Sequence, residues 1–285
     1  MKVVVLGASG QLGSELCRAL ADWQLTALTH ADIEIGDDAR VRDVIGSLSA
    51  DLVINAAGLT NVSGAEEEPQ RAFEVNALGA RNVARACASA GSALMHMSTD
   101  YVFDGEKGSP YLECDLPNPV NVYGVTKLAG EHFVRAIAKR WYIVRTSGLY
   151  SEFECRGKRY NFVRRMLESA KAGGLKVVSD EISTPTFAAD LAQQIRLIAE
   201  KGRPGLYHAT NSGQCSWYEF ASTIFELTRA RVELIAISAS EYSSTMRRPR
   251  YSVLQNGYLQ QQNLDIMRPW QEALADYLGR IGATR

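Results

Sequence analysis

The feature that most constrains this chain is the regular alternation of short apolar runs and helical patterns over residues 1–150. Lys2–Leu6 predicts a buried strand, and the helix predicted after it carries Leu12 and Leu16 on one face. Strands and helices that alternate in this way form a parallel, doubly wound sheet, so we predict an α/β fold of Rossmann type. Further strands are predicted at 25–28, 52–55, 93–97 and 141–145, and helices at 39–47, 70–90 and 126–139.

The second half of the chain has a less regular pattern. It begins with a polar segment at residues 151–160, predicted to be an exposed loop. Ser216 and Glu219 have the spacing of a capping box at a helix start. We therefore predict a dinucleotide-binding domain at residues 1–150 and a smaller α/β substrate-binding lobe at residues 151–285, partly interleaved with the first. Short strands are predicted at 175–178, 206–209 and 232–237.

The composition argues against several classes of function. The 31 Lys and Arg and 32 Asp and Glu give a formal net charge of -1, so neither nucleic acid nor a membrane surface is expected as a partner. No apolar stretch approaches the roughly 20 residues that span a bilayer. The five cysteines are scattered without a Cys-x-x-Cys pair, so we predict no disulfide framework and no metal site. A cytoplasmic enzyme is expected.

The sequence GASGQLG at residues 7–13 connects the first predicted strand to the first predicted helix. Gly7, Gly10 and Gly13 allow a tight turn and a close approach of the backbone to a pyrophosphate, and the helix N-terminus supplies unpaired N–H groups. A flexible turn without a ligand is the alternative. The position directly after a strand favours a dinucleotide-binding site.

The end of the second predicted strand bears on the choice of cofactor. A carboxylate there would bind the ribose 2′-hydroxyl of NAD, but the residues are Thr29 and His30, and no acid follows until Asp32. This leaves room for a 2′-phosphate, although no Arg or Lys adjoins it. We predict NADPH, with NADH as the alternative, and leave open whether His30 is a phosphate ligand or a surface residue. Asp37 or Asp38 is placed to reach the adenine edge.

The third predicted strand ends in the small residues Ala56, Ala57 and Gly58. Because the carboxyl ends of parallel strands meet at one edge of the sheet, bulk at these positions would strike a cofactor bound there. The alternative is that these small residues only end the strand and have no role in binding a cofactor.

A catalytic group is predicted from Tyr123, Lys127 and Thr99. Tyr123 and Lys127 are four residues apart and share one face of a helix. A tyrosine with a pKa of about 10 is a poor acid at neutral pH, and a neighbouring ammonium stabilises its phenolate. Thr99 ends a predicted strand, where its hydroxyl can hold the substrate oxygen. Glu131, four residues beyond Lys127, is expected to pair with it.

Segments spread over nearly the whole chain carry a resemblance to a known family. The chain resembles the extended short-chain dehydrogenase/reductases and, within them, the dTDP-4-dehydrorhamnose reductase family. The segments are GASGQLG (7–13), NAAGLTNV (55–62), MSTDYVFDG (97–105), NVYGVTKLAGE (121–131), RTSGLY (145–150), TPTFAADLA (184–192), GLYHATN (205–211) and MRPW (267–270).

The resemblance implies reduction of the C4 ketone of dTDP-4-dehydro-L-rhamnose to dTDP-L-rhamnose. Hydride would pass from NADPH or NADH to C4, and Tyr123 would protonate the resulting alkoxide. The family's Thr, Tyr and Lys fall on Thr99, Tyr123 and Lys127, and its substrate contacts on Thr99 and Asp100. A homodimer is common in the family. Its cofactor contacts fall on Gly10, Gln11, Leu12, Asp37, Asp38, Gly58, Leu59, Thr60 and Met97.

Two positions separate this chain from related enzymes. The related 4,6-dehydratases carry a sequence similar to S-T-D-E-V-Y-G at this strand end. In the present chain Tyr101 occupies the position of their catalytic Glu. The family reductases usually carry an aromatic residue within R-T-S-W-x-Y, and Gly148 stands at that position. The missing ring widens the predicted substrate pocket and leaves the identity of the sugar open.

Other assignments keep two interpretations. Asn161 is predicted to face the substrate, with helix capping as the alternative. The run Arg247–Arg250 could bind a nucleotide diphosphate or form a solvated charge run. Two alternatives remain for the whole protein: a reductase or epimerase of another nucleotide sugar, and a non-catalytic, cofactor-binding regulatory subunit.

Overall fold

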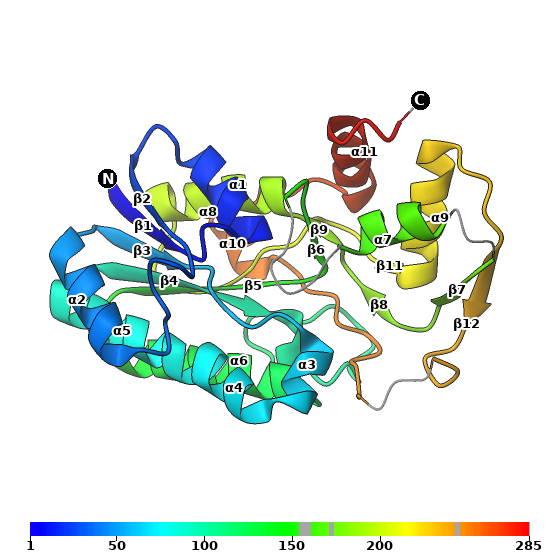
Figure 1. The fold of residues 1–285 in the computed structure, drawn as a ribbon. Helices are drawn as coiled ribbons and strands as arrows, with labels where there is room; N and C mark the ends of the chain where they lie inside the picture. The colour runs from blue at the N-terminus through cyan, green and yellow to red at the C-terminus, as the bar shows by residue number, and fades with distance from the viewer. Residues whose placement is uncertain (154–160, 171–173, 243–245, 285) are drawn as a thin grey trace.

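A six-stranded parallel sheet forms the centre of the protein in the computed structural model, which describes residues 1–153, 161–170, 174–242 and 246–284 (Figure 1). The strand order is β10-β5-β4-β3-β1-β2, which confirms the predicted fold class. The strands are β1 (Lys2–Leu6), β2 (Gln24–Leu28), β3 (Leu52–Asn55), β4 (Ala93–Thr99), β5 (Trp141–Thr146) and β10 (Gly205–His208).

Helices cover both faces of this sheet (Figure 1). One face packs against α1 (Gln11–Ala19) and α8 (Ala188–Lys201), and the core between them includes Leu16 and Ile195. The opposite core includes Val41 and Val83, buried from water on helices of the other layer. These helices are α2 (Asp38–Leu48), α5 (Ala80–Ala90) and α6 (Val122–Ile137).

Two helices differ from the sequence prediction in ways that affect the site. The single helix predicted at 70–90 is divided into α4 (Pro69–Phe73), the π-helical segment η1 (Glu74–Gly79) and α5. Helix α6 begins four residues earlier than predicted, because the Asn121 side chain accepts a hydrogen bond from the Gly124 amide at 2.8 Å and caps it. Tyr123 therefore lies in the first turn of the same helix as Lys127.

Apart from β10 and α8, the described part of the second half forms a lobe of short strands and helices. Its core is aromatic and includes Tyr150, Phe187 and Phe220. The capping box of Ser216 and Glu219 is present. Pairs of strands form small two-stranded sheets. The elements are β6 (Leu149–Tyr150), α7 (Phe162–Ser169), β7 (Leu175–Val178), β8 (Ile182–Ser183), β9 (Thr186–Phe187), β11 (Cys215–Ser216), α9 (Trp217–Thr228), β12 (Leu234–Ile237) and α11 (Trp270–Arg280).

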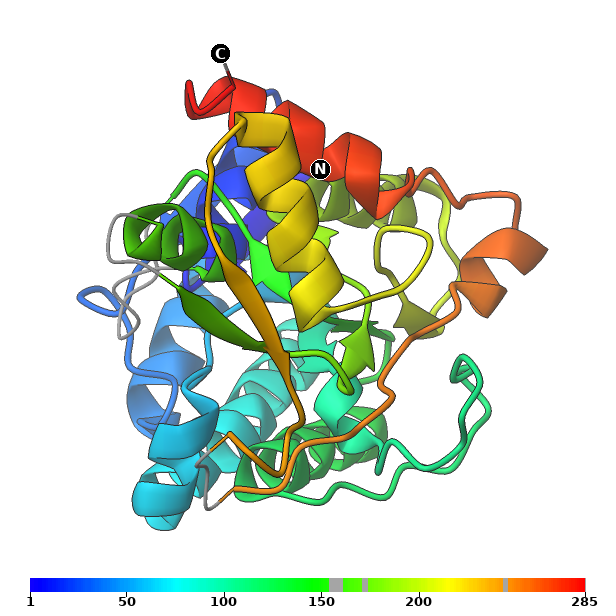
Figure 2. The same cartoon turned by 90° about the vertical axis from the view of Figure 1, so that its right-hand side faces the viewer.

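The two halves of the sequence are interleaved in space. Strand β10 and helix α8 come from the second half, yet β10 joins the central sheet beside β5, with His208 opposite Arg145. In Figure 2 the segment after β12 runs in orange towards α6. There the Asn121 side chain donates to the Arg247 carbonyl at 3.0 Å. Within the described residues, no helix is long and apolar enough to span a bilayer.

Candidate active site

The glycine-rich turn after β1 packs directly on the end of β3. Gly7 has φ +77°, and a Cβ there would lie 2.8 Å from the Ala57 amide nitrogen. A Cβ at Gly13 would collide with the Gly7 carbonyl oxygen. Gly10 is the N-cap of α1 and provides no side-chain cap, so the first amides of the helix have no side-chain acceptor of that kind. Two predicted cofactor segments thus meet at one edge of the sheet.

Asn76 in the π-helical segment holds the loop after β3 and was missed by the sequence analysis. Its Oδ1 accepts from the Leu59 amide at 2.9 Å, and its Nδ2 donates to the Leu59 carbonyl at 3.1 Å. The same Nδ2 donates to Thr126 Oγ1 on α6 at 3.2 Å. The segment Ala57–Thr60 is therefore tied to the helix that carries Tyr123 and Lys127. A helical period of 3.6 residues does not reveal a π-helical turn, which is frequent at functional sites.

The ammonium of Lys127 is buried between α6 and β4. Its Nζ donates to the Met97 carbonyl at 2.6 Å, and the side chain lies under the loop at Gly58, where a Cβ would be 3.8 Å from Nζ. Burial lowers the pKa of Lys127 to about 8, and the charge of Glu131 opposes this shift. Tyr123 is half-buried, and its ring meets the ring of Tyr101 edge-on with centroids 5.9 Å apart.

Thr99 and Asp100 form a hydrogen-bonded group at the end of β4. Thr99 Oγ1 donates to Asp100 Oδ1 at 3.0 Å, and Ser147 Oγ donates to Asp100 Oδ2 at 2.9 Å. Burial raises the pKa of Asp100, and the hydroxyls of Ser252, Ser147 and Thr99 oppose this shift. The hydrogen bond to Asp100 thus sets the direction in which the Thr99 O–H points.

Glu131 does not bond to Lys127 as expected from the spacing. Its carboxylate accepts two hydrogen bonds from Arg145 and one from Ser98. The i to i+4 spacing on a helix allows Glu131 and Lys127 to pair, but Arg145 on the neighbouring strand β5 hydrogen-bonds both oxygens of the carboxylate.

At the end of β2, the fold places the positively charged side chain of Arg40, although the sequence next to this strand end contains no Arg or Lys. Thr29 donates to Asp32 Oδ2 through its amide and hydroxyl at 2.8 and 2.7 Å. Arg40 from α2 donates to the Asp32 carbonyl through Nη2 at 3.3 Å. His30 is exposed and lies 3.2 Å from Glu34. Only the fold shows that Arg40 lies beside the end of β2, where the sequence analysis expected the cofactor to be selected.

The predicted adenine contacts Asp37 and Asp38 are engaged at the start of α2. Asp37 caps the helix by accepting from the Arg40 amide at 3.0 Å. The Asp38 carboxylate pairs with Arg42 at 2.9 Å. A contact from either carboxylate to adenine would therefore have to be made in addition to these hydrogen bonds.

Two predicted substrate residues have structural constraints of their own. Gly148 has φ +53°, and a Cβ there would lie 3.1 Å from Pro185 Cα, so a larger residue would need a shift of its neighbours. Asn161 caps α7 by accepting from the Arg164 amide at 3.0 Å and donates to the Ser151 carbonyl at 2.8 Å. The capping alternative for Asn161 is the role seen here, and a substrate contact would have to compete with these bonds.

Arg248 faces the same edge from the second lobe. Burial raises the pKa of Glu181 and that of Tyr101, and the positive charge of Arg248 opposes both shifts. The Nε of Arg248 is buried and has no hydrogen-bond partner among the described residues. Arg247 and Arg250 are exposed.

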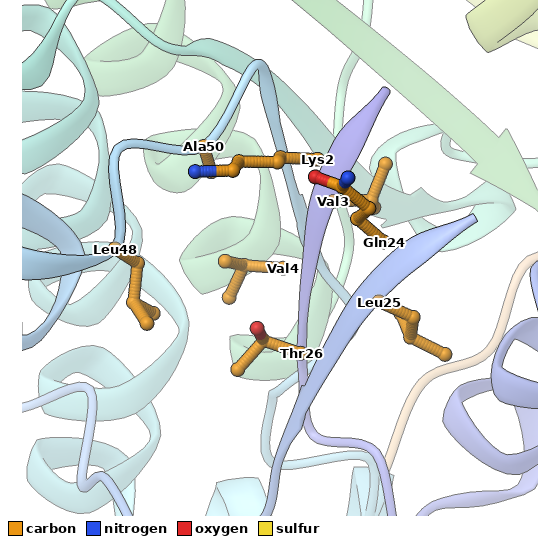
Figure 3. A pocket seen from close by; sticks show the side chains of 8 residues that line it. All are labelled: Lys2, Val3, Val4, Gln24, Leu25, Thr26, Leu48 and Ala50. Atoms are coloured by element: carbon orange, nitrogen blue, oxygen red, sulfur yellow. The ribbon is translucent and has the colours of Figure 1, made fainter.

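One open hollow in the described residues lies away from these side chains. It has a volume of about 280 Å³ and sits at the amino ends of β1 and β2, opposite the edge where the site residues converge (Figure 3). Lys2 is its one ionisable side chain, and the rest of the lining is mainly apolar. This hollow offers no acid–base chemistry, and we assign no function to it. No group of three His, Cys, Asp or Glu suited to a metal ion occurs in the part of the chain that the structure describes.

Comparisons with known proteins give similarity along nearly the whole chain. A family described as the RmlD substrate binding domain matches residues 1–282. The spore coat polysaccharide biosynthesis protein SpsK of Bacillus subtilis is 40% identical, over 97% of this chain and 96% of that protein. The dTDP-4-dehydrorhamnose reductase of Mycolicibacterium smegmatis is 38% identical, over 99% of this chain and 87% of that protein. The crystal structure of dTDP-4-dehydrorhamnose reductase from Bacillus anthracis in complex with NADP has a TM-score of 0.93 and 36% identity, over 98% of this chain and 100% of that chain.

Proposed function

The chain belongs to the dTDP-4-dehydrorhamnose reductase family, and on that premise we propose that Thr99, Tyr123 and Lys127 catalyse reduction of the C4 keto group of dTDP-4-dehydro-L-rhamnose. The protein is an NAD(P)-dependent oxidoreductase that reduces a keto group of a dTDP-sugar, and NADPH is its cofactor. The observation that carries the assignment of residues is the buried Lys127 ammonium, held at the Met97 carbonyl one helical turn from Tyr123.

The residues at the sheet edge fit a dinucleotide. Gly7 and Gly13 leave no space for a Cβ, and α1 begins at this edge with no side-chain cap on its first amides. When bound, the cofactor supplies the hydride. The residues that would hold it are Gly7, Gly10, Gln11, Leu12, Gly13, Asp37, Asp38, Ala57, Gly58, Leu59, Thr60, Met97, Tyr123 and Lys127.

The proton is supplied by the chain itself. Tyr123 protonates the alkoxide that forms at C4, and the positive charge of Lys127 stabilises the phenolate that remains. When substrate binds, the Thr99 hydroxyl turns its single O–H from Asp100 Oδ1 to the substrate oxygen. Because reduction needs one hydride and one proton, Tyr101 can stand at the position of the dehydratase Glu without loss of this reaction.

The substrate is proposed to bind between this edge and the second lobe. Asp100 and Gly148 flank the sugar, and Asn161 stays a predicted contact. Arg248 contributes its buried Nε, which has no hydrogen-bond partner in the described part of the chain, to the nucleoside diphosphate. Arg247 and Arg250 form the solvated part of the run. A homodimer and a cytoplasmic location are also predictions.

The function is tested by following NADPH absorbance with dTDP-4-dehydro-L-rhamnose as substrate. The proposal requires one NADPH consumed per dTDP-L-rhamnose formed. An epimerase would convert the sugar without net loss of NADPH, and a regulatory subunit would do neither. A parallel series of UDP- and dTDP-4-keto sugars defines which sugar the pocket at Gly148 accepts.

A further inference from the structure

We propose that Arg145 is a positioning residue for the reduction: by binding both carboxylate oxygens of Glu131, it keeps this carboxylate from pairing with Lys127. The inference rests on the proposed function, because a Lys127 ammonium that is not paired with Glu131 matters for turnover only if Tyr123 donates the proton.

The Glu131–Arg145 ion pair is fully enclosed between α6 and β5. Arg145 Nε donates to Glu131 Oε1 at 2.8 Å and Nη2 donates to Oε2 at 2.7 Å, and both side chains are 2% exposed. Ser98 Oγ on β4 donates to Glu131 Oε1 at 2.5 Å. This planar, two-point contact defines the carboxylate orientation in a way that a single ammonium does not.

Without Arg145, Lys127 would be the natural partner of Glu131. The two residues are one turn apart on α6, and the charge of Glu131 already raises the pKa of Lys127 against the effect of burial. In a buried site, an unpaired carboxylate is strongly attracted to the nearest cation. Capture of Lys127 would draw its charge away from the Met97 carbonyl and from Tyr123.

The groups around Lys127 make this balance depend mainly on Glu131 and Arg145. His96 on β4 faces Lys127, but burial, followed by the Lys127 charge, keeps its pKa well below the usual value, so it is neutral. From η1, Asn76 presents an uncharged amide. The other charged or titratable groups on α6 and on the described elements packed against it are Glu66 and Glu67 (α3, Val62–Glu67), Arg71 (α4), Glu74 (η1), Arg81, Arg85 and Cys87 (α5), Asp100 and Tyr101 (η2, Asp100–Val102), Tyr142 (β5), and Tyr123, His132 and Arg135 (α6).

Arg145 packs between an aromatic ring and a neutral imidazole. Its guanidinium carbon lies 5.1 Å from the centroid of the Phe103 ring. On the adjacent strand, burial and the Arg145 charge lower the pKa of His208 to about 3, so this imidazole is also neutral. Arg145 hydrogen-bonds the Glu131 carboxylate. Burial raises the pKa of Glu113, and the charge of Arg145 opposes this shift. The Glu131–Arg145 pair itself adds no net charge to the surroundings of Lys127.

The test is the pH dependence of kcat in single and double variants. The alkaline limb of the wild-type profile is expected at about pH 8, where Lys127 loses its charge. Glu131→Gln leaves Arg145 as an uncompensated cation and moves the limb to lower pH by about one unit. Arg145→Met leaves Glu131 to pair with Lys127, lowers kcat by about tenfold or more and moves the limb to higher pH.

The double variant Glu131→Gln/Arg145→Met decides between electrostatic and purely structural roles. It again has no net charge beside Lys127, so the limb returns to its wild-type position and kcat recovers relative to Arg145→Met. A structural role would give losses of activity with the limb unmoved in all three variants, and that result would overturn the inference. If Arg145→Met does not fold, the other two variants still test the inference, because the limb should move to lower pH in Glu131→Gln and stay at the wild-type position in the double variant.

Arg268→Met provides a matched control. Arg268 makes a similar two-point pair with Asp190 at 2.9 and 2.8 Å, but Asp190 lies on α8, on the opposite face of the sheet from α6. Its loss should lower thermal stability and leave the alkaline limb in place. Wild-type enzyme that fails to consume NADPH would reject the proposed function, whereas active enzyme with unmoved limbs would reject only the role of Arg145.

Discussion

The two ends of the proposed cofactor site differ in how they hold charge. At the catalytic end, Lys127, Asp100 and Glu131 are buried, and each has hydrogen-bond partners at fixed distances. At the adenosine end, His30 and Arg40 are exposed around the end of β2. Buried charges interact in a low dielectric, whereas exposed charges are screened by water and salt. Substitutions at the first end should therefore have large effects, and those at the second end small ones.

The largest effect is expected for Tyr123→Phe. The variant keeps the ring beside Tyr101 but has no proton to donate, so kcat should fall by about 10³-fold or more. Steady-state assays measure the loss, and fluorescence titration should show that NADPH binds as it does to the wild type. Undiminished turnover in this variant would reject the assigned acid.

Lys127→Met should come second. Removal of the buried ammonium withdraws the charge that stabilises the phenolate and should lower kcat by about 10²-fold. The alkaline limb near pH 8 should also disappear, because the group that titrates there has been removed. A Lys127→Met profile that retained this limb would show that another group controls it.

A moderate effect is expected at the pyrophosphate turn. Gly13→Ala places a methyl group against the Gly7 carbonyl, so the turn must shift, at a cost of about 1–3 kcal/mol in stability or in cofactor binding. Gly46→Ala on α2 is the control, because nothing lies within 4 Å of a Cβ there. That change should be neutral or stabilise the helix by about 0.5–1 kcal/mol. Equal losses in the two variants, measured by thermal unfolding and NADPH titration, would argue against the tight turn.

The smallest effect is expected for Arg40→Ala. Loss of this exposed cation should weaken NADPH binding a few-fold and leave NADH binding unchanged, and higher salt should reduce the difference. Arg42→Ala removes a similar charge that pairs with Asp38 and should not distinguish the two cofactors. A parallel loss of NADH affinity would show that Arg40 acts on the fold and not on the 2′-phosphate.

The sequence predicted what depends on local pattern. Apolar runs identified the strands β1 to β5, and the spacing of Tyr123 and Lys127 placed them on one helix. Pairing between distant segments left no local signal. The strand predicted at 206–209 lies in the central sheet, and Arg145, not Lys127, binds Glu131. The role of Asn76 depends on a π-helical turn that a regular helical period does not indicate.

The ionisation of Tyr123 can be measured directly. Phenolate absorbance near 295 nm is titrated in wild type and in Tyr123→Phe with oxidised cofactor bound, and the difference isolates this one phenol. If the buried charge of Lys127 prepares Tyr123 for proton transfer, the difference signal should titrate clearly below pH ~10, and Lys127→Met should move it upwards. A phenol that ionises at or above pH ~10 in both backgrounds would contradict the proposed mechanism.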